Sequence, residues 1–360
     1  MKGTHRFSII AIVVAFTLKA SPTFLLADDP IFTDSIAPRV GVAFQTGRGD
    51  LGDFNLPIKN MISGGFADVA GPSLGDVKFY GWQSEFTIPI KGLGLGEQFA
   101  DLQFVFDANW GRSSFQSEAF DIRTSATNAT QSLLLDPWGT GGTFGSNGYI
   151  PLNNNMYFAD HLNVWGLNTY EEQLYTFGIE KICFVQEQLL IQSTIAFLLG
   201  NTTQGQILEG QTGVVGGANG TPTIDYRYEN NLKSTRYGIQ VGVSVEYEVG
   251  EFWGRPVKLF ANGEARYIYN DAEGDSYAEA RGAVNYTGMN RSIEENWSDI
   301  GLSATAGIEI DICELTGLTA GVHAETWSIG ELQTTAGEPF TIDEVDRDTV
   351  SFVIGLRHQF

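Results

Sequence analysis

The chain has 360 residues, of which only 18% are Asp, Glu, Lys or Arg, below the roughly 25% of typical soluble domains. Glycine accounts for 43 residues, and 42% of the chain is hydrophobic, which excludes a chain that is disordered throughout. A net charge of −22 excludes a general nucleic-acid binder, which needs a basic surface. Two cysteines are too few for a disulfide framework or a four-cysteine zinc site. No cofactor and no metal are expected.

Residues 1–27 have the pattern of a secretory signal peptide, although a buried N-terminal helix is the alternative. A basic start is followed by an apolar run from Phe7 to Leu18, which is too short to cross a bilayer. Cleavage after Ala27 would leave residues 28–360 as one domain, with 18 Lys and Arg against 43 Asp and Glu, a net charge of −25. No later stretch approaches 18 consecutive apolar residues, so we expect no transmembrane helix.

The next feature is a two-residue alternation that predicts β-strands. From Tyr237 to Val249 every second residue is apolar, and the residues between are Gly, Gln, Ser or Glu. A helix would scatter this apolar set around its circumference, whereas a strand places it on one face. The same pattern predicts ten strands, around residues 40–44, 82–90, 102–110, 165–179, 189–199, 237–249, 257–269, 300–312, 318–324 and 350–360. Most reach the ~9–11 residues that a tilted membrane strand needs.

The connections between these strands alternate in length. Long and short connections follow one another without exception, which is typical of a transmembrane barrel with long extracellular loops and short periplasmic turns. In lipid an antiparallel sheet must close, because no water satisfies an edge strand. The sequence therefore predicts an all-β transmembrane antiparallel barrel of about ten strands. Two further strands could lie within residues 116–164, so eight or twelve strands remain alternatives.

Aromatic residues gather near the predicted strand ends, where interfacial girdles are expected. The outer group comprises Tyr80, Trp82, Trp110, Trp165, Tyr237, Tyr267, Tyr269 and Trp297. The inner group comprises Phe99, Phe177, Tyr247, Phe252 and Phe360.

The last eleven residues carry the one family-like motif. Phe352, Ile354 and Leu356 alternate behind a terminal Phe360, with His358 in place of the usual apolar residue. This segment resembles the C-terminal signature of Gram-negative outer-membrane β-barrels, and the whole pattern is similar to porin-like pore proteins. The resemblance implies an outer-membrane location, contact with outer-membrane lipids and recognition by the barrel-assembly machinery. It does not indicate an oligomeric state.

The predicted inward face of the strands carries more acids than bases. The acids are Glu85, Asp101, Asp107, Glu180, Glu246, Glu264, Glu309 and Glu325, and the bases are Arg39, Lys258, Arg266 and Arg357. Ten strands lie near the lower limit for an open lumen. One interpretation is a narrow pore that favours cations and passes small solutes, because unpaired carboxylates select cations. The other is a filled, salt-bridged interior, in a barrel whose acidic loops contact lipopolysaccharide or partners.

Three acidic clusters are expected in the long loops. They are Asp271, Glu273, Asp275 and Glu279; Glu294, Glu295 and Asp299; and Glu338, Asp343, Glu344, Asp346 and Asp348.

A hydrolase at the rim is the least favoured hypothesis. Its candidates are Asp160 with His161, and His323 with Glu325 on one strand face, although such a pair is more often structural. Cys183 and Cys313 lie near different inner turns, so we expect two free cysteines.

Overall fold

A computed structural model describes residues 38–50, 58–62, 65–68, 76–94, 99–116, 120–123, 133–135, 150–151, 161–186, 188–213, 224–282, 286–328 and 346–360. The expected signal peptide, residues 1–27, lies outside these ranges, as do Asp160, Glu338, Asp343 and Glu344. Within the described residues no helix is long and apolar enough to cross a membrane.

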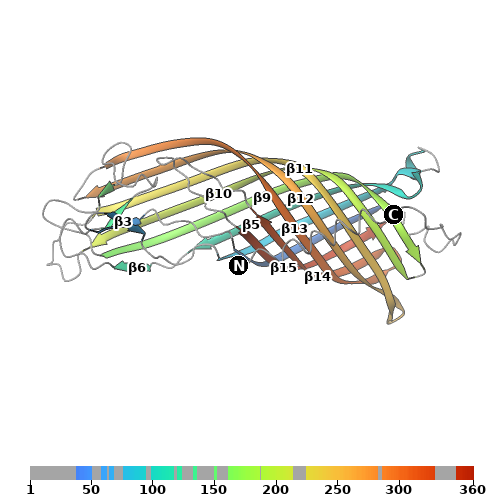
Figure 1. Cartoon of the computed structure of the whole chain (residues 1–360). Coiled ribbons are helices and arrows are strands. Elements are labelled where there is room, and N and C mark those ends of the chain that lie inside the picture. Colours follow the sequence, from blue (N-terminus) through green and yellow to red (C-terminus); the bar gives the residue numbers. More distant parts are fainter. Residues whose placement is uncertain are drawn as a thin grey trace.

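Ten long strands form one closed antiparallel barrel (Figure 1). They are β1 (Arg39–Asp50), β4 (Asp76–Pro89), β5 (Leu102–Gln116), β9 (His161–Gln186), β10 (Leu189–Gly213), β11 (Ile224–Phe252), β12 (Arg255–Gly282), β13 (Tyr286–Cys313), β14 (Thr316–Ser328) and β15 (Asp346–Gln359). The first and last strands pair over their whole length, with Arg39 opposite Gln359 and Asp50 opposite Asp348. Pairing of β9 with β10 completes the ring, so the prediction of about ten strands is confirmed.

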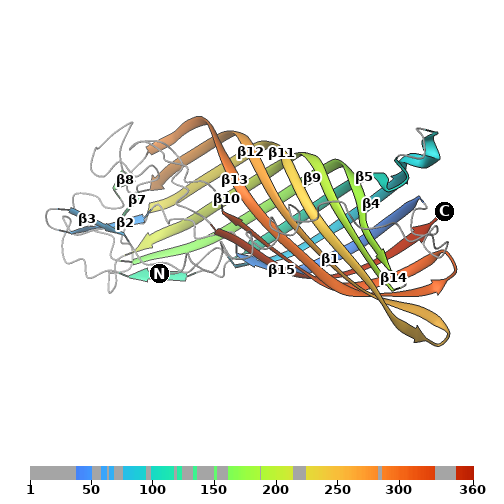
Figure 2. The same cartoon turned by 45° about the vertical axis from the view of Figure 1, so that its right-hand side comes forward.

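In the described parts of residues 116–164, where two further strands were an alternative, the structure has three short strands before β9, and none of them is long enough to cross the membrane. β6 (Phe120–Arg123) pairs with the outer end of β9. β7 (Leu133–Leu135) and β8 (Ile150–Pro151) join β2 (Ile58–Ile62) and β3 (Gly65–Asp68) in a separate four-stranded sheet. This sheet lies at the end of the barrel where the long strands finish (Figure 2).

The outward face of the wall carries a continuous apolar belt. On β10, Ile195 and Phe197 are 63% and 72% exposed, while Ala196 and Leu198 between them are buried. On β11 the belt runs from Tyr237 to Val249, about 40 Å along the strand and about 30 Å across a bilayer at a tilt of ~40°. An exposed apolar surface of this extent requires lipid rather than water. The barrel therefore spans a membrane.

Five strands are much longer than the sequence indicated. β9 to β13 contain 26, 25, 29, 28 and 28 residues, and they extend beyond their five shorter neighbours at one end of the barrel (Figure 1). Two of the three acidic clusters assigned to loops are wrong for this reason. Asp271, Glu273, Asp275 and Glu279 belong to β12, and Glu294, Glu295 and Asp299 belong to β13. In the third cluster, Asp346 and Asp348 begin β15.

Beyond the belt the outward face of the wall becomes polar, and apolar side chains lie on its inward face. On β11, Thr235 and Lys233 are exposed, whereas Leu232, Tyr228 and Tyr226 are buried inside. Leu208 on β10 and Ala272 on β12 are also buried there. The extension is therefore polar outside and apolar inside, as expected for a sheet that leaves lipid and meets water. Trp297 belongs to this inward row with Asp299, so its assignment to the outer aromatic girdle is wrong.

Candidate functional site: the charged lumen

The interior of the membrane-spanning part is organised around three arginines at successive depths. Each is held by inward-pointing carboxylates of strands at least two places away in the ring, and Arg266 also by Glu264 of its own strand, because side chains of one pleat all face the lumen. Arg357 lies nearest the C-terminal residue Phe360, Arg266 is further out, and Arg236 is beyond it towards the extended end.

Arg357 of β15 draws three strands together. Its Nη1 lies 2.8 Å from Glu309 Oε2 on β13 and 3.0 Å from Glu246 Oε1 on β11. Its Nη2 lies 3.8 Å from Glu85 Oε2 on β4. Arg39 of β1 approaches the same Glu246 carboxylate at 3.6 Å. These bonds reach across the lumen, so the ion cluster braces the barrel as well as lining it.

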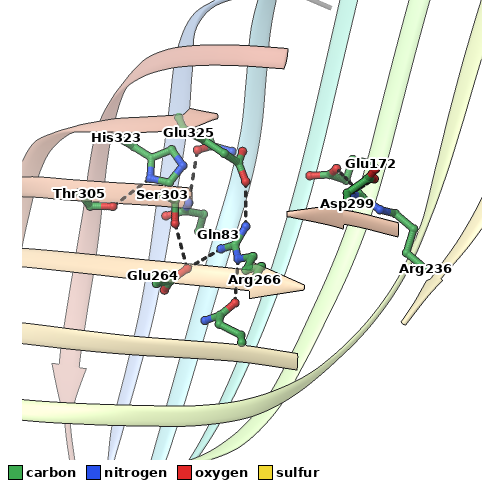
Figure 3. Close-up of polar contacts among 12 residues, drawn as sticks. Gln83, Glu172, Arg236, Glu264, Arg266, Asp299, Ser303, Thr305, His323 and Glu325 are labelled. Carbon is green, nitrogen blue, oxygen red and sulfur yellow. Dashed lines mark hydrogen bonds and ion pairs between the residues drawn. The ribbon is translucent and has the colours of Figure 1, made fainter. Parts of the chain in front are cut away.

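Arg266 of β12 holds the second layer (Figure 3). Its guanidinium lies 2.5 Å from Glu264 and 2.8 Å from Glu325, and its Nε donates to Gln240 Oε1 at 2.8 Å. Ser303 also donates to Glu264, at 3.1 Å. Each of the three guanidinium nitrogens of this arginine therefore donates to an acceptor, as expected for a buried charge.

Arg236 of β11 forms the outermost layer (Figure 3). It lies 2.6 Å from Glu172 Oε2 on β9 and 3.6 Å from Asp299 Oδ2 on β13. Asn270 donates to Asp299 at 2.7 Å, and the Tyr170 hydroxyl donates to Glu172 at 2.5 Å. All five side chains are buried.

A cavity of about 210 Å³ lies within the first two layers. Among its lining residues are five acids and three arginines, namely Glu85, Asp107, Glu180, Glu246, Glu264, Arg39, Arg266 and Arg357. Glu180 accepts hydrogen bonds from Gln103, Gln192 and Thr194. Among the described residues, no Lys or Arg comes within 4.0 Å of the Asp107 or Glu180 carboxylates. The β5–β9 wall is therefore acidic, whereas the β12–β15 wall is charge-paired.

The structure brings most of the sequence-predicted lumen residues together, with Asp101 as the exception. Glu85, Asp107, Glu246, Glu264, Arg266 and Arg357 line the cavity, and Glu309 and Glu325 complete its ion clusters. Asp101 instead lies in the turn before β5, where it is 3.7 Å from Lys181. Lys258 lies 3.8 Å from Asp311. These placements concern geometry alone, and the part that each residue plays in transport remains a prediction.

The candidate catalytic pairs do not assemble. His323 and Glu325 share a strand face but have different partners: His323 Nδ1 lies 2.9 Å from Thr305 Oγ1, and Glu325 binds Arg266. His161 begins β9, and Asp160 lies outside the described residues. Cys183 and Cys313 are free and exposed, as expected.

The terminal strand presents its alternate apolar side chains to the lipid. Phe352, Ile354, Leu356 and Phe360 are 68%, 60%, 51% and 66% exposed. The backbone N–H of Phe360 donates to Pro38 O at 3.0 Å, so the end of the chain closes the ring beside β1.

The sequence did not point to the outermost layer of the lumen. Arg236 and Trp327 lie in or next to predicted connections, Asp299 belongs to a predicted acidic loop cluster, and Glu172 lies in the predicted strand 165–179 but is not among the predicted lumen acids. The sequence does contain a signal for a longer strand, because Ser234 and Arg236 continue the row of inward-facing residues of β11. The signal is obscured because the apolar residues of that segment lie on the inward face instead of the outward face.

No protein-family model and no curated protein matches the chain. Three solved structures of low similarity span nearly the whole chain. Outer membrane protease OmpT of Escherichia coli has a TM-score of 0.39 and 8% identity, covering 94% of this chain and 100% of its own. The Pseudomonas putida toluene transporter TodX has a TM-score of 0.27 and 8% identity, with 92% and 93% covered. The transport unit of the E. coli autotransporter AIDA-I has a TM-score of 0.30 and 8% identity, with 97% and 98% covered.

These scores are too low to say anything of activity, and the assignment rests on the closed sheet and its apolar belt. An antiparallel barrel with a lipid-facing belt, short turns at one end and long connections at the other is the architecture of bacterial outer-membrane proteins. The chain is a β-barrel of that type, and it resides in the outer membrane.

Proposed function

We propose that the barrel gives small cations and small cationic solutes a narrow, passive route through the outer membrane. The observation that carries this proposal is the acidic β5–β9 wall of the cavity, where Asp107 and Glu180 lie with no basic side chain within 4.0 Å among the described residues. A carboxylate beside a narrow, low-dielectric lumen attracts a passing cation more strongly than one in bulk water, because Coulomb energy scales as 1/ε.

The test is single-channel recording of the purified protein in planar bilayers, under a salt gradient. The wild type is expected to prefer cations, and the Asp107→Asn/Glu180→Gln variant to shift the reversal potential towards neutrality. The preference should weaken as salt rises, since the Debye length falls from ~10 Å at 0.1 M to ~3 Å at 1 M. An anion-selective wild type, or a variant with an unaltered reversal potential, would contradict the proposal.

A matched control removes the same amount of charge outside the lumen. Asp271 and Glu273 lie on the exposed face of β12, so Asp271→Asn/Glu273→Gln should leave the reversal potential near the wild-type value. The pair Glu246→Gln/Glu264→Gln is a less clean test. Those carboxylates face Arg357 and Arg266, and their neutralisation would remove one ion-pair partner from each guanidinium.

A second candidate is a structural surface barrel without an open pore. It is favoured by the extension of β9 to β13, whose inner face is buried and apolar rather than wet. Folded protein that conducts no ions would favour this candidate. Deletion of the connecting segments 117–160 would then be expected to reduce binding of cells to a surface or partner.

A further inference from the structure

A large aromatic side chain, Trp327, lies in the lumen beside its charged layers. Trp327 lies near the outer end of β14, on the inward pleat, and is 1% exposed. It belongs to one buried apolar cluster with Leu174, Leu198 and Ile268. The strands that carry these residues are β14, β9, β10 and β12.

The position of Trp327 in the ring shows how far this cluster reaches. The strand order is β10-β11-β12-β13-β14-β15-β1-β4-β5-β9, closed by pairing of β9 with β10. β14 and β9 are five strands apart in either direction, so Trp327 and Leu174 come from opposite walls. A buried cluster that contains both side chains crosses the full width of the lumen.

Two arginines hold the indole ring. The guanidinium carbon of Arg236 lies 4.7 Å from the ring centroid and that of Arg266 lies 5.8 Å from it, within the range of cation–π attraction. Arg236 pairs in register with Asn270, four residues further out along β12 than Arg266. The ring therefore contacts the second and the outermost charged layers together, and both arginines are fixed by carboxylates.

The wall beside the Trp327 ring has a glycine where a side chain would collide with the indole. Gly301 lies opposite Trp327 in the β13–β14 register, and a Cβ at this position would come within 2.5 Å of the indole. The cavity of the first two layers is lined by Arg266 and Gln240 but not by Trp327 or Arg236. It therefore ends at the layer that the indole occupies.

We propose that Trp327 is the steric plug that sets the size limit of passage through this barrel. The acidic cavity is a vestibule on the side of the C-terminal residue Phe360, and the indole with its apolar neighbours separates it from the extended end. This inference rests on the proposed cation route, since a plug limits passage only where the rest of the lumen conducts.

The test compares conductance across the series wild type, Trp327→Phe and Trp327→Ala in planar bilayers. The control is Trp82→Ala, which removes an indole that is 52% exposed on the lipid-facing side. Heat-modifiable migration on gels verifies that each variant is folded. We expect Trp327→Ala to raise single-channel conductance several-fold, Trp327→Phe to raise it less, and Trp82→Ala to leave it unchanged.

The outcomes separate the plug from the route. Equal, measurable conductance in the wild type and all folded variants would overturn the plug and leave the cation route intact. No conductance in any folded variant would overturn both. If Trp327→Ala fails to fold, Trp327→Phe decides alone, because a smaller ring in the same place must widen a passage that the indole limits.

Discussion

Gly301 and Trp327 face each other across the β13–β14 register, and the indole occupies the space that any side chain at position 301 would need. A methyl group there would lie 2.5 Å from the ring carbon Cζ3. The ring cannot move away freely, because Arg236 and Arg266 contact it and because it belongs to a buried apolar cluster. The pair therefore behaves as one packing unit.

Gly301→Ala is expected to lower the free energy of unfolding by about 1–3 kcal/mol, the usual cost of overpacking a tight site. The control is Gly263→Ala on β12, where an added Cβ meets nothing within 4 Å, so stability should hold or rise slightly. Urea unfolding in lipid vesicles measures both. In a Trp327→Ala background the cost of Gly301→Ala should largely disappear, and an undiminished cost would contradict the coupling.

The buried apolar cluster that contains Trp327 predicts that neighbouring leucines of β10 differ in their contribution to stability. Leu198 is 1% exposed inside the barrel, and Leu199 is 53% exposed towards lipid. Leu198→Ala should cost about 2–5 kcal/mol, because it leaves a cavity in a packed cluster. Leu199→Ala should cost less, since lipid chains fill the vacated space. Equal costs in vesicle unfolding would show that the inner cluster is not a packed core.

The number of strands and the residues that face the lumen could be predicted, because within the lipid-facing belt the apolar residues of a strand occupy every second position. Between Tyr237 and Val249 the apolar residues occupy odd positions, and lipid requires all of them to face outward. The alternation continues towards Ile224, but there the apolar residues are Tyr226, Tyr228 and Leu232, at even positions. The outward apolar alternation therefore ends at the edge of the membrane, and the pattern predicts a loop where the strand continues.

The ion-pair partners of the lumen charges could not be predicted from the sequence, for a different reason. The alternation places Arg357, Glu246 and Glu309 on inward faces, but their meeting depends on the shear and diameter of the closed barrel. The pairing of His323 with Glu325 failed on the same ground. Residues two apart on a strand share a face, but His323 pairs with Thr305 on the adjacent strand β13, and Glu325 pairs with Arg266 on β12.

Removal of the Arg357 charge from the lumen is expected to lower stability. Arg357→Met would leave Glu246, Glu309 and Glu85 facing one another without their shared cation, and loss of one partner of a buried ion pair typically costs about 3–5 kcal/mol. The control is Lys258→Met, since Lys258 and Asp311 are partly exposed and 3.8 Å apart and such pairs contribute at most ~1 kcal/mol. Similar unfolding midpoints for the two variants would argue against a bracing role.

The end of the chain predicts an effect on assembly rather than on stability. Phe360 is 66% exposed, its backbone N–H donates to Pro38 O, and its ring lies edge-on to His358 at 4.8 Å. A side chain so exposed contributes little packing within the barrel, so a requirement for it would reflect recognition before or during insertion. Phe360→Asp, or deletion of Phe360, should lower the amount of protein in the outer membrane while export across the inner membrane continues.

The control, Phe360→Tyr, retains an aromatic terminus and should keep wild-type abundance. Fractionation with immunoblotting, alongside refolding of each purified variant into vesicles, measures the two effects separately. Unchanged abundance of Phe360→Asp would refute an assembly signal, and a loss matched by equally poor refolding in vesicles would assign the effect to stability instead.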